Sequence, residues 1–452
     1  MELTETKRKL FIFTLLAGTF TMSISQSALS TAYPALMHFF TVDAATIQWL
    51  TTGFMLMMCV MMPVSPWLLN NISFKHLYLS VLALFGIGTL MIIFAPTFWF
   101  ALLGRLLEAT AVGILFPSFQ TVLMTITPKD KRGQTMGAAG LVMGSASAVG
   151  PIISGIVLNF LRWQALFWLF CFLMLVIFLA ACVTISDVME QKPSQLDVFS
   201  LFYEGAGLGM VLYALTAFKD PAHLLSSVLL LLLGLGLLIA FCQRQLKLAT
   251  PLLELRIVKY LAFDIGLLLT GLSYMSLIVV TIVFPLYYQK ILGLSPLASG
   301  LSLVLPAVLL SVLNPITGKL ADKWGFKPVL LVGVSMLLSG WAGLLLWQDH
   351  LGLPLLIAFS MVIEGGNAFV MMPATTLGAN SVPKNLIAHA TALTTTIRQL
   401  LGSLGVMGAT LLLSNAGQSI TQKSSYSRVF ICFLLIEAIA LVLALRLKEV
   451  KK

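Results

Sequence analysis

Two glutamates interrupt long apolar runs, and each is followed nine positions later by a proline. Glu108 and Pro117 stand in RLLEATAVGILFP, whereas Glu364 and Pro373 stand in MVIEGGNAFVMMP. An ionised carboxylate at the centre of a bilayer costs at least about 2.5–3.5 kcal/mol. One such residue could be an accident of packing. Two in the same local pattern predict one functional element used twice, in a transporter whose cavity carries protonatable groups.

Two arginines also fall inside apolar runs and are expected to be the charge partners of these acids. Arg105 precedes Glu108 by three positions, which places both on one face of a helix. Arg398 lies near the middle of a later run and is the expected partner of Glu364. Desolvation favours a neutral carboxyl group and a nearby arginine favours its charged form. A carboxyl group between these effects can load and release a proton, although a static ion pair at either glutamate is the alternative.

Two further acids are weaker candidates for a direct role. Glu437 lies about ten residues into the last apolar run, and Asp264 lies near the start of the ninth. The last helix of such a protein is expected at the periphery, away from a central cavity. Asp264 is a candidate for the mouth of the pathway.

The composition indicates a polytopic membrane protein. Of 452 residues, 59% are hydrophobic and only 10% are charged, against about 25% charged in a typical soluble domain. The net charge of +10 comes from basic residues in short segments between apolar runs, which argues for membrane orientation and against nucleic-acid binding. The five cysteines form no CxxC pair and the five histidines have no ligand spacing, so no metal site is predicted.

Fourteen apolar runs are long enough to cross a bilayer, which takes about 20 residues. With both termini in the cytoplasm, the segments between them place 20 Lys and Arg residues inside and 5 outside. The first run, although preceded by basic residues, is too polar for a signal peptide and is expected to be retained. The runs are 10–31, 45–69, 76–96, 98–126, 134–159, 164–185, 199–218, 222–242, 261–287, 296–318, 327–347, 351–373, 387–414 and 427–446.

An internal repeat divides the chain. The first and ninth runs open about 252 positions apart, Asn70 and Asp322 have the same separation, and the two glutamates are 256 apart. The sequence therefore predicts an all-α protein with a six-helix bundle over 1–186, a linker with two extra spans over 187–258, and a second six-helix bundle over 259–452. Parallel repeats of this kind are typical of transporters with a site between the halves.

Three motifs give these runs a family resemblance. The segment GKLADKWGFKP (318–328) matches the loop motif of the major facilitator superfamily, GRLLEATAVG (104–113) its fourth-helix arginine motif, and GLVMGSASAVGPIISG (140–155) the antiporter motif of its drug exporters. With fourteen spans, the chain resembles the fourteen-helix drug:proton antiporters over nearly its whole length.

The resemblance implies roles for the motif residues. Gly318, Asp322, Lys323 and Gly325 would form a cytoplasmic gate, with Asp322 near the N-terminus of the eleventh helix, where its charge meets the helix dipole. A mere topology anchor is the alternative, and the first copy of the loop has Asn70 in place of the acid. Small residues allow close packing of the fifth helix, and the resemblance of its antiporter motif implies export. The motif residues are Gly140, Gly144, Gly150, Pro151 and Gly155.

One departure from the family pattern concerns the first helix. Many fourteen-helix exporters carry an aspartate there, whereas this chain has ISQSALSTAYP, with Ser25 or Gln26 at that position and Ser30 in place of an asparagine. These three residues and Asn367 remain candidates to line the substrate cavity. The proton-coupling role then falls on Glu108 and Glu364.

The expected function is export of amphipathic drugs by proton antiport across the cytoplasmic membrane. The resemblance implies alternating access by a monomer, several cationic or zwitterionic substrates, and the proton gradient as energy source with no cofactor. A dedicated exporter of one metabolite or antibiotic class is the alternative. A receptor or an enzyme is disfavoured because the sequence has no soluble domain, nucleotide motif or nucleophile–base pattern.

Overall fold

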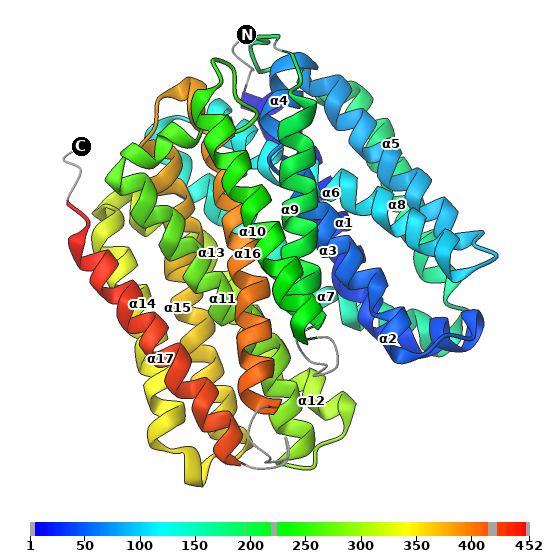
Figure 1. Ribbon diagram of the computed structural model, residues 1–452, viewed down its shortest axis with the longest axis vertical. Coiled ribbons are helices and arrows are strands. Elements are labelled where there is room, and N and C mark those ends of the chain that lie inside the picture. The colour runs from blue at the N-terminus through cyan, green and yellow to red at the C-terminus, as the bar shows by residue number, and fades with distance from the viewer. Residues whose placement is uncertain (1–4, 194, 218–223, 415–422, 449–452) are drawn as a thin grey trace. The chain divides into compact units, whose positions relative to one another are not determined.

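The computed structural model describes the chain except residues 1–4, 194, 218–223, 415–422 and 449–452 (Figure 1). Helices are the only regular secondary structure among the described residues, which contain no strand. Helices satisfy their backbone hydrogen bonds internally, which a chain this apolar requires in a bilayer. The α-helices are α1 Glu5–Phe40, α2 Ala44–Ile47, α3 Trp49–Met61, α4 Ser65–Asn71, α5 Phe74–Ile93, α6 Phe98–Ile126, α7 Arg132–Phe160, α8 Gln164–Thr184, α9 Val198–Ala217, α10 Leu224–Lys247, α11 Leu261–Lys290, α12 Pro296–Ser302, α13 Val304–Trp324, α14 Phe326–Leu346, α15 Leu353–Asn380, α16 Ile387–Ser414 and α17 Lys423–Arg446.

Twelve of the fourteen predicted runs fall on one helix each, whereas 45–69 is divided among α2, α3 and α4, and 296–318 between α12 and α13. Within the described part of the chain, twelve helices are long and apolar enough to span a membrane. The pair α3 and α4, bent by 51° at its break, makes a thirteenth if it is one span. The remaining run is α9, whose described apolar stretch over Val198–Ala214 is shorter than a span. The fold is therefore that of an all-helical membrane protein, with about twelve clear spans.

The predicted repeat is visible in the helix order. α6 and α15 are both long helices with a buried glutamate near their middle and a proline inside, Pro117 and Pro373 respectively. Each is followed by one 3-10 turn, Lys129–Lys131 or Lys384–Leu386, and then by another long helix, α7 or α16. The same local sequence order thus produces the same local structure in both parts of the chain.

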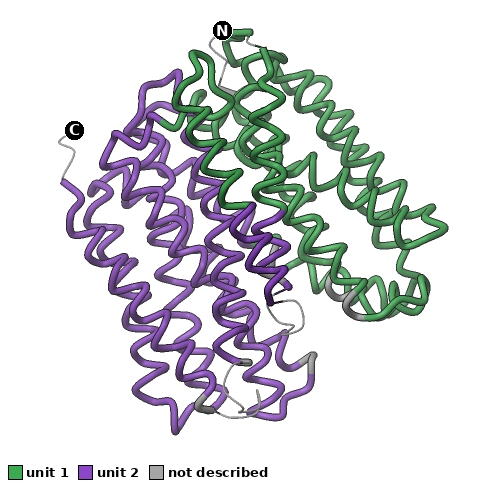
Figure 2. The backbone as a smooth tube through the Cα atoms, viewed as in Figure 1, with its two compact units in different colours: residues 1–126, 145–209, 234–255 green, residues 127–144, 210–233, 256–452 purple. Residues whose placement is uncertain are grey.

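Contacts between Cα atoms divide the chain into two compact units, coloured separately in Figure 2. Unit 1 contains 1–126, 145–209 and 234–255, and unit 2 contains 127–144, 210–233 and 256–452. In unit 1, α6 packs against α3 and α5, and α8 packs against α1 and α5. In unit 2, α15 packs against α11, α13 and α14, while α17 packs against α11, α14 and α16. The predicted domain boundaries at 186 and 258 remain a prediction.

The two units have separate apolar cores. In unit 1 a cluster of buried residues includes Leu29 of α1, Phe98 of α6 and Phe167 of α8. In unit 2 the core surrounds Trp341, which is fully buried and packs edge-on or tilted against Phe284, Phe430 and Phe433. These cores fix the helices on which the buried polar residues lie.

Candidate functional site

Glu108 lies in a buried polar cluster where α6 meets α5 and α3. Its Oε2 accepts from Arg105 Nη1 at 2.5 Å, and its Oε1 accepts from the Thr89 hydroxyl at 2.7 Å. Arg105 and Glu108 are 1% and 0% exposed. The guanidinium also donates to the carbonyl of Leu50 and stacks 4.0 Å from the centroid of the Phe54 ring. Both carboxylate oxygens are therefore satisfied, and the predicted pairing with Arg105 is seen.

Two glycines bring Thr89 within reach of Glu108. A Cβ on Gly88 would lie 2.5 Å from the carbonyl oxygen of Gly104, and one on Gly104 would lie 2.6 Å from the carbonyl oxygen of Gly88. Only residues without a side chain allow the two helix backbones to approach this closely. The close contact of α5 with α6 thus supplies the second hydrogen bond to the carboxylate.

Glu364 lies in a different polar cluster, between α15 and α11. Its Oε2 accepts from Asn367 Nδ2 at 3.3 Å, and Asn367 Oδ1 accepts from the Ser273 hydroxyl at 2.6 Å. Glu364 is buried, and Asn367 is fully so. The structure therefore joins the predicted coupling residue and the predicted cavity residue Asn367 in one hydrogen-bonded chain.

The expected partnership between Glu364 and Arg398 is not seen. Within the described residues no ion pair joins them, and Arg398 of α16 instead places its guanidinium 5.3 Å from the centroid of the Tyr274 ring. Its Nε has no hydrogen-bond partner there. Glu364 instead accepts from Asn367, three residues later on α15, because the side chain of Arg398 points to Tyr274. The two glutamates therefore have unlike partners, a cation for one and an amide for the other.

The polar residues of the first helix are only partly described. Ser25 is buried and its hydroxyl has no partner among the described residues, while Gln26 is half-buried. The side chain of Ser30 lies outside the described residues. The neighbouring Ser27 donates to the carbonyl of Ala146 in α7 at 2.9 Å. Ser25 is thus the predicted cavity residue with unused hydrogen-bonding capacity.

Asp322 caps a helix, but not the one that was expected. It lies in the last turn of α13, and its two carboxylate oxygens accept from the backbone N–H groups of Gly133 and Gln134, at 2.9 and 2.8 Å. These are the first unbonded amides of α7, so the charge meets the dipole of α7 and not that of α14. Gly318 lets this happen, because its backbone lies directly against that of Gly133.

The other predicted gate residues, Gly325 and Lys323, lie at the end of α13. Gly325 has φ of 91°, a left-handed conformation that favours glycine, and it links α13 to α14. Lys323 is exposed. Arg132, at the start of α7, donates to Asn380 Oδ1 at the end of α15 at 2.7 Å. The start of α7 is therefore held by both α13 and α15.

The small residues of α7 are used unevenly. A Cβ on Gly140 would lie 2.8 Å from Cγ of Asn314, and one on Gly144 would lie 2.8 Å from the Ser311 hydroxyl, so both face α13. Gly150 lies directly against Ser27 of α1. Pro151 is exposed, and a Cβ on Gly155 would meet nothing within 4 Å. Close packing explains three of these positions and not Gly155.

The two weaker acids have different settings. Asp264 is half-buried in the first turn of α11, and its Oδ1 has no partner among the described residues. Glu437 is fully buried in α17, where its Oε1 accepts from the Ser276 hydroxyl at 2.5 Å.

Sequence reasoning missed Thr89, Ser273 and Ser276, because each lies on a different helix from the residue to which it donates. No group of three or more metal-ligating side chains is found in the described residues.

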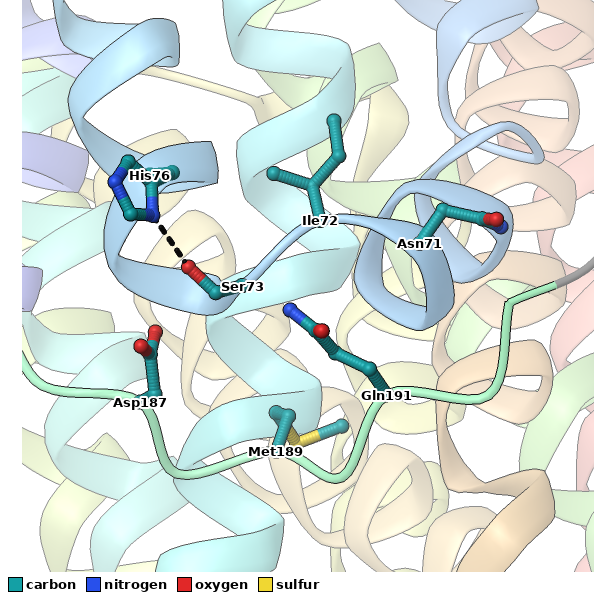
Figure 3. Close-up of a pocket in the computed structure, with 7 residues that line it drawn as sticks. All are labelled: Asn71, Ile72, Ser73, His76, Asp187, Met189 and Gln191. Carbon is teal, nitrogen blue, oxygen red and sulfur yellow. Dashed lines mark hydrogen bonds between the residues drawn. The ribbon is translucent and has the colours of Figure 1, made fainter.

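A separate pocket of about 650 Å³ lies where α4 and α5 meet the segment after α8 (Figure 3). Ser73 and His76 are hydrogen-bonded at 2.6 Å, and Asp187 Oδ1 accepts from the backbone N–H of Lys75 at 3.0 Å. Asn70, which stands where the loop motif has an acid, contributes its carbonyl to Lys192 N–H instead. The first loop copy is thus held by the segment after α8, and none of the residues lining this pocket belongs to the buried glutamate clusters.

Comparisons with known proteins agree with this architecture. The family model described as Major Facilitator Superfamily matches residues 15–406. The MFS-type transporter YcnB of Bacillus subtilis (strain 168) is 33% identical over 96% of this chain and 93% of its own. Lincomycin resistance protein LmrB of Listeria monocytogenes serovar 1/2a is 32% identical over 89% and 86%. The solved structure of the proton:xylose symporter XylE superposes with a TM-score of 0.71 over 99% and 98% at 12% identity.

Proposed function

This chain belongs to the Major Facilitator Superfamily and is a multi-pass membrane transporter, and on that premise we propose that it exports drugs in exchange for protons. The observation that carries the proposal is the pair of buried glutamates at equivalent places in α6 and α15. Intramembrane acids are costly, and in transporters they mark proton or substrate pathways. The membrane is the bacterial cytoplasmic membrane, with fourteen spans, both termini inside, and a monomer as the working unit.

The proposed cycle loads and unloads the two carboxyl groups together. From the outside-open state, protons bind Glu108 and Glu364 and the drug leaves. In the inside-open state, the protons pass to the cytoplasm and a new drug molecule binds. Each net charge that moves is worth about 2.3 kcal/mol per 100 mV of membrane potential. The capping of α7 by Asp322 supports a gate that closes on the cytoplasmic side in one of these states.

The names of the relatives support a proposed substrate class. LmrB of Listeria monocytogenes is named for lincomycin resistance and aligns with most of this chain. Lincomycin is therefore the first substrate to test, and amphipathic cationic and zwitterionic drugs are the proposed range. Ser25, Gln26 and Asn367 are the proposed polar contacts of the drug. Transport of lincosamides alone would favour a dedicated exporter over a multidrug exporter.

The test is proton movement driven by drug in proteoliposomes that contain the full chain. Addition of lincomycin should drive protons across the vesicle membrane, and this proton flux should be absent from vesicles without the protein. Glu108→Gln and Glu364→Gln should each abolish this exchange, whereas Asp349→Asn, an exposed acid in unit 2, should leave it unchanged. Normal exchange in both glutamine variants would refute the carboxylate mechanism.

A further inference from the structure

Glu437 occupies a buried polar position that the proposed cycle leaves unused. It lies on α17 where this helix packs against α11 and α14, and it is 0% exposed. Its Oε1 accepts from the Ser276 hydroxyl of α11 at 2.5 Å. Ser276 Oγ in turn accepts from Trp341 Nε1 of α14 at 3.2 Å. Through these two hydrogen bonds, residues of α11, α14 and α17 meet at one carboxyl group.

No charge compensates this carboxyl group. Its Oε2 has no hydrogen-bond partner and no ion pair to Glu437 exists within the described residues. Apolar residues of the unit 2 core lie one turn away along the helices: Phe433 is four residues before Glu437 on α17, and Val280 is four residues after Ser276 on α11. The charged or titratable residues described on α17 and on the helices packed against it lie mostly near helix ends or in the turn after α14. The exceptions are Tyr274 and Arg398, which stack on each other, and Cys432, five positions before Glu437 on α17. The full set is Asp264, Tyr274, Tyr287, Tyr288, Lys290, Lys327, Asp349, His350, His389, Arg398, Tyr426, Arg428, Cys432 and Arg446.

A charged carboxylate with one unbonded oxygen is unfavourable in such surroundings, whereas the neutral acid is tolerated. The Ser276 hydroxyl has one proton, and because its oxygen already accepts from Trp341, that proton points to Glu437 Oε1. The proton of the acid then belongs on Oε2, the oxygen without a partner. The proton-binding atom is therefore Oε2, and the hydrogen bond from Ser276 to Oε1 depends on the position of α11.

The same stretch of α11 reaches the other buried acid of unit 2. Ser273 and Ser276 are one helical turn apart, and Ser273 donates to Asn367, which donates to Glu364. Residues three apart lie on one helix face. A shift of α11 would therefore change the hydrogen bonding of Glu364 and Glu437 together.

We propose that Glu437 is a further proton-binding residue, whose Oε2–H bond forms and breaks as α11 moves during transport. The proton comes from water and returns to water, and no other group is oxidised, reduced or transferred. The inference rests on the proposed proton-coupled function for its role in transport. Whether Glu437 binds a proton can be tested without a transport measurement.

The first experiment is infrared difference spectroscopy of the purified full-length protein as the pH is varied. A protonated carboxylic acid in apolar surroundings gives a carbonyl stretching band above the amide I band, and Glu437→Gln should remove one such band. Asp349→Asn, on an exposed acid of the same unit, should remove none. Identical spectra for the wild-type protein and Glu437→Gln would overturn the proposal.

The second experiment measures protons exchanged per lincomycin molecule in proteoliposomes, across a range of pH. In Glu437→Gln we expect fewer protons per drug and a shifted pH profile, which a merely structural residue would not cause. If the wild-type protein couples protons to lincomycin and Glu437→Gln couples them identically, this inference fails and the proposed function stands. If the wild-type protein moves no protons, the proposed function fails, and the infrared result alone decides whether Glu437 holds a proton.

A folding defect in the glutamine variant would not end the test. Ser276→Ala keeps the acid and removes the hydroxyl that donates to Oε1, so it should move the position of the infrared band and the pH at which it titrates. An unchanged band in Ser276→Ala, with the protein folded, would show that this hydrogen bond does not govern Glu437 and would overturn the proposal.

Discussion

At the scale of single residues, the two repeat-related glutamates face different electrostatic problems. Glu108 has a cation on its own helix and hydrogen bonds to both oxygens, whereas Glu364 has an amide and no cation among its described partners. A buried charge that loses its partner costs far more than a buried hydrogen bond that is lost. The arginine should therefore be needed for folding to a degree that the asparagine is not.

The change Arg105→Leu tests this difference. It should lower the free energy of unfolding by about 3–5 kcal/mol, because it leaves the Glu108 carboxylate buried and unpaired. Asn367→Ala should cost only about 1–3 kcal/mol. Thermal unfolding of both variants in detergent makes the comparison, and the double change Arg105→Leu with Glu108→Leu should recover part of the loss. Equal costs for the two single variants would show that Glu108 is not charged in the folded protein.

The residue scale also shows what the sequence could predict. The pairing of Arg105 with Glu108 was predictable, because three positions on one helix fix the geometry. The partners Thr89, Ser273 and Ser276 were not, because they depend on which helices pack together. The expected ion pair between Glu364 and Arg398 was wrong for the same reason: depth in a helix does not determine the direction in which a side chain points.

At the scale of helices, α7 is held through its backbone. Its first amides are capped by Asp322, and its glycines let α13 approach. The sequence motif around Gly318 predicted an acid at the N-terminus of a helix, but the capped helix is α7 and not the next helix in the chain. The order of helices in the sequence suggested that Asp322 caps α14, whereas the packing of α13 against α7 determines the helix that it caps.

Alanine substitutions separate close packing from helix propensity in α7. Gly137→Ala should destabilise the protein by about 1–3 kcal/mol, because its Cβ would lie against the backbone of Asn314 and Pro315. Gly155→Ala is the matched control, since its Cβ would meet nothing within 4 Å, and it should be neutral or stabilising by up to about 1 kcal/mol. Thermal unfolding of both variants distinguishes them. A stable Gly137→Ala would mean that α7 and α13 are not tightly packed in solution.

The hairpin of α9 and α10 carries a polar clasp with a defined pH dependence. Asp197 accepts from Arg244 Nε at 2.6 Å and Nη2 at 2.9 Å, and also from Ser200. The hydrogen bonds from Arg244, the largest influence, lower the pKa of Asp197 to about 2. The clasp should therefore contribute fully above the ordinary pKa of an aspartate, near 4, and lose its contribution as the pH falls toward 2.

Asp197→Asn is the variant that measures this clasp. Because Arg244 is more than a third exposed, solvent screening should limit the cost to about 1 kcal/mol at pH 7. The difference in melting temperature between the wild-type protein and Asp197→Asn should be constant from pH 5 to pH 8 and shrink below about pH 4. A difference that grows on acidification would contradict the assigned interaction.

At the scale of the whole molecule, the number of spans decides on which side of the membrane each segment lies. The repeat of α6 with α7 and α15 with α16 followed from sequence alone, because a duplicated sequence repeats its local structure. The number of membrane spans, predicted as fourteen, was harder to derive from the sequence. The described apolar part of α9 is shorter than a bilayer span, and α3 and α4 are bent at their junction. Hydropathy measures apolar length but not whether a helix crosses or is bent.

Three cysteine probes, each placed in a protein whose native cysteines are replaced by serine, settle the count. Fourteen spans with both termini inside predict that a membrane-impermeant maleimide labels Leu224→Cys and Asp349→Cys in intact cells and labels Gln191→Cys only after permeabilisation. If α9 and α10 fold back without crossing, Leu224→Cys becomes protected while Asp349→Cys stays labelled, and the protein has twelve spans. If α10 crosses and α9 does not, every later segment inverts and Asp349→Cys becomes protected. That last outcome would also place the C-terminus outside and abolish the cytoplasmic excess of basic residues on which the orientation rests.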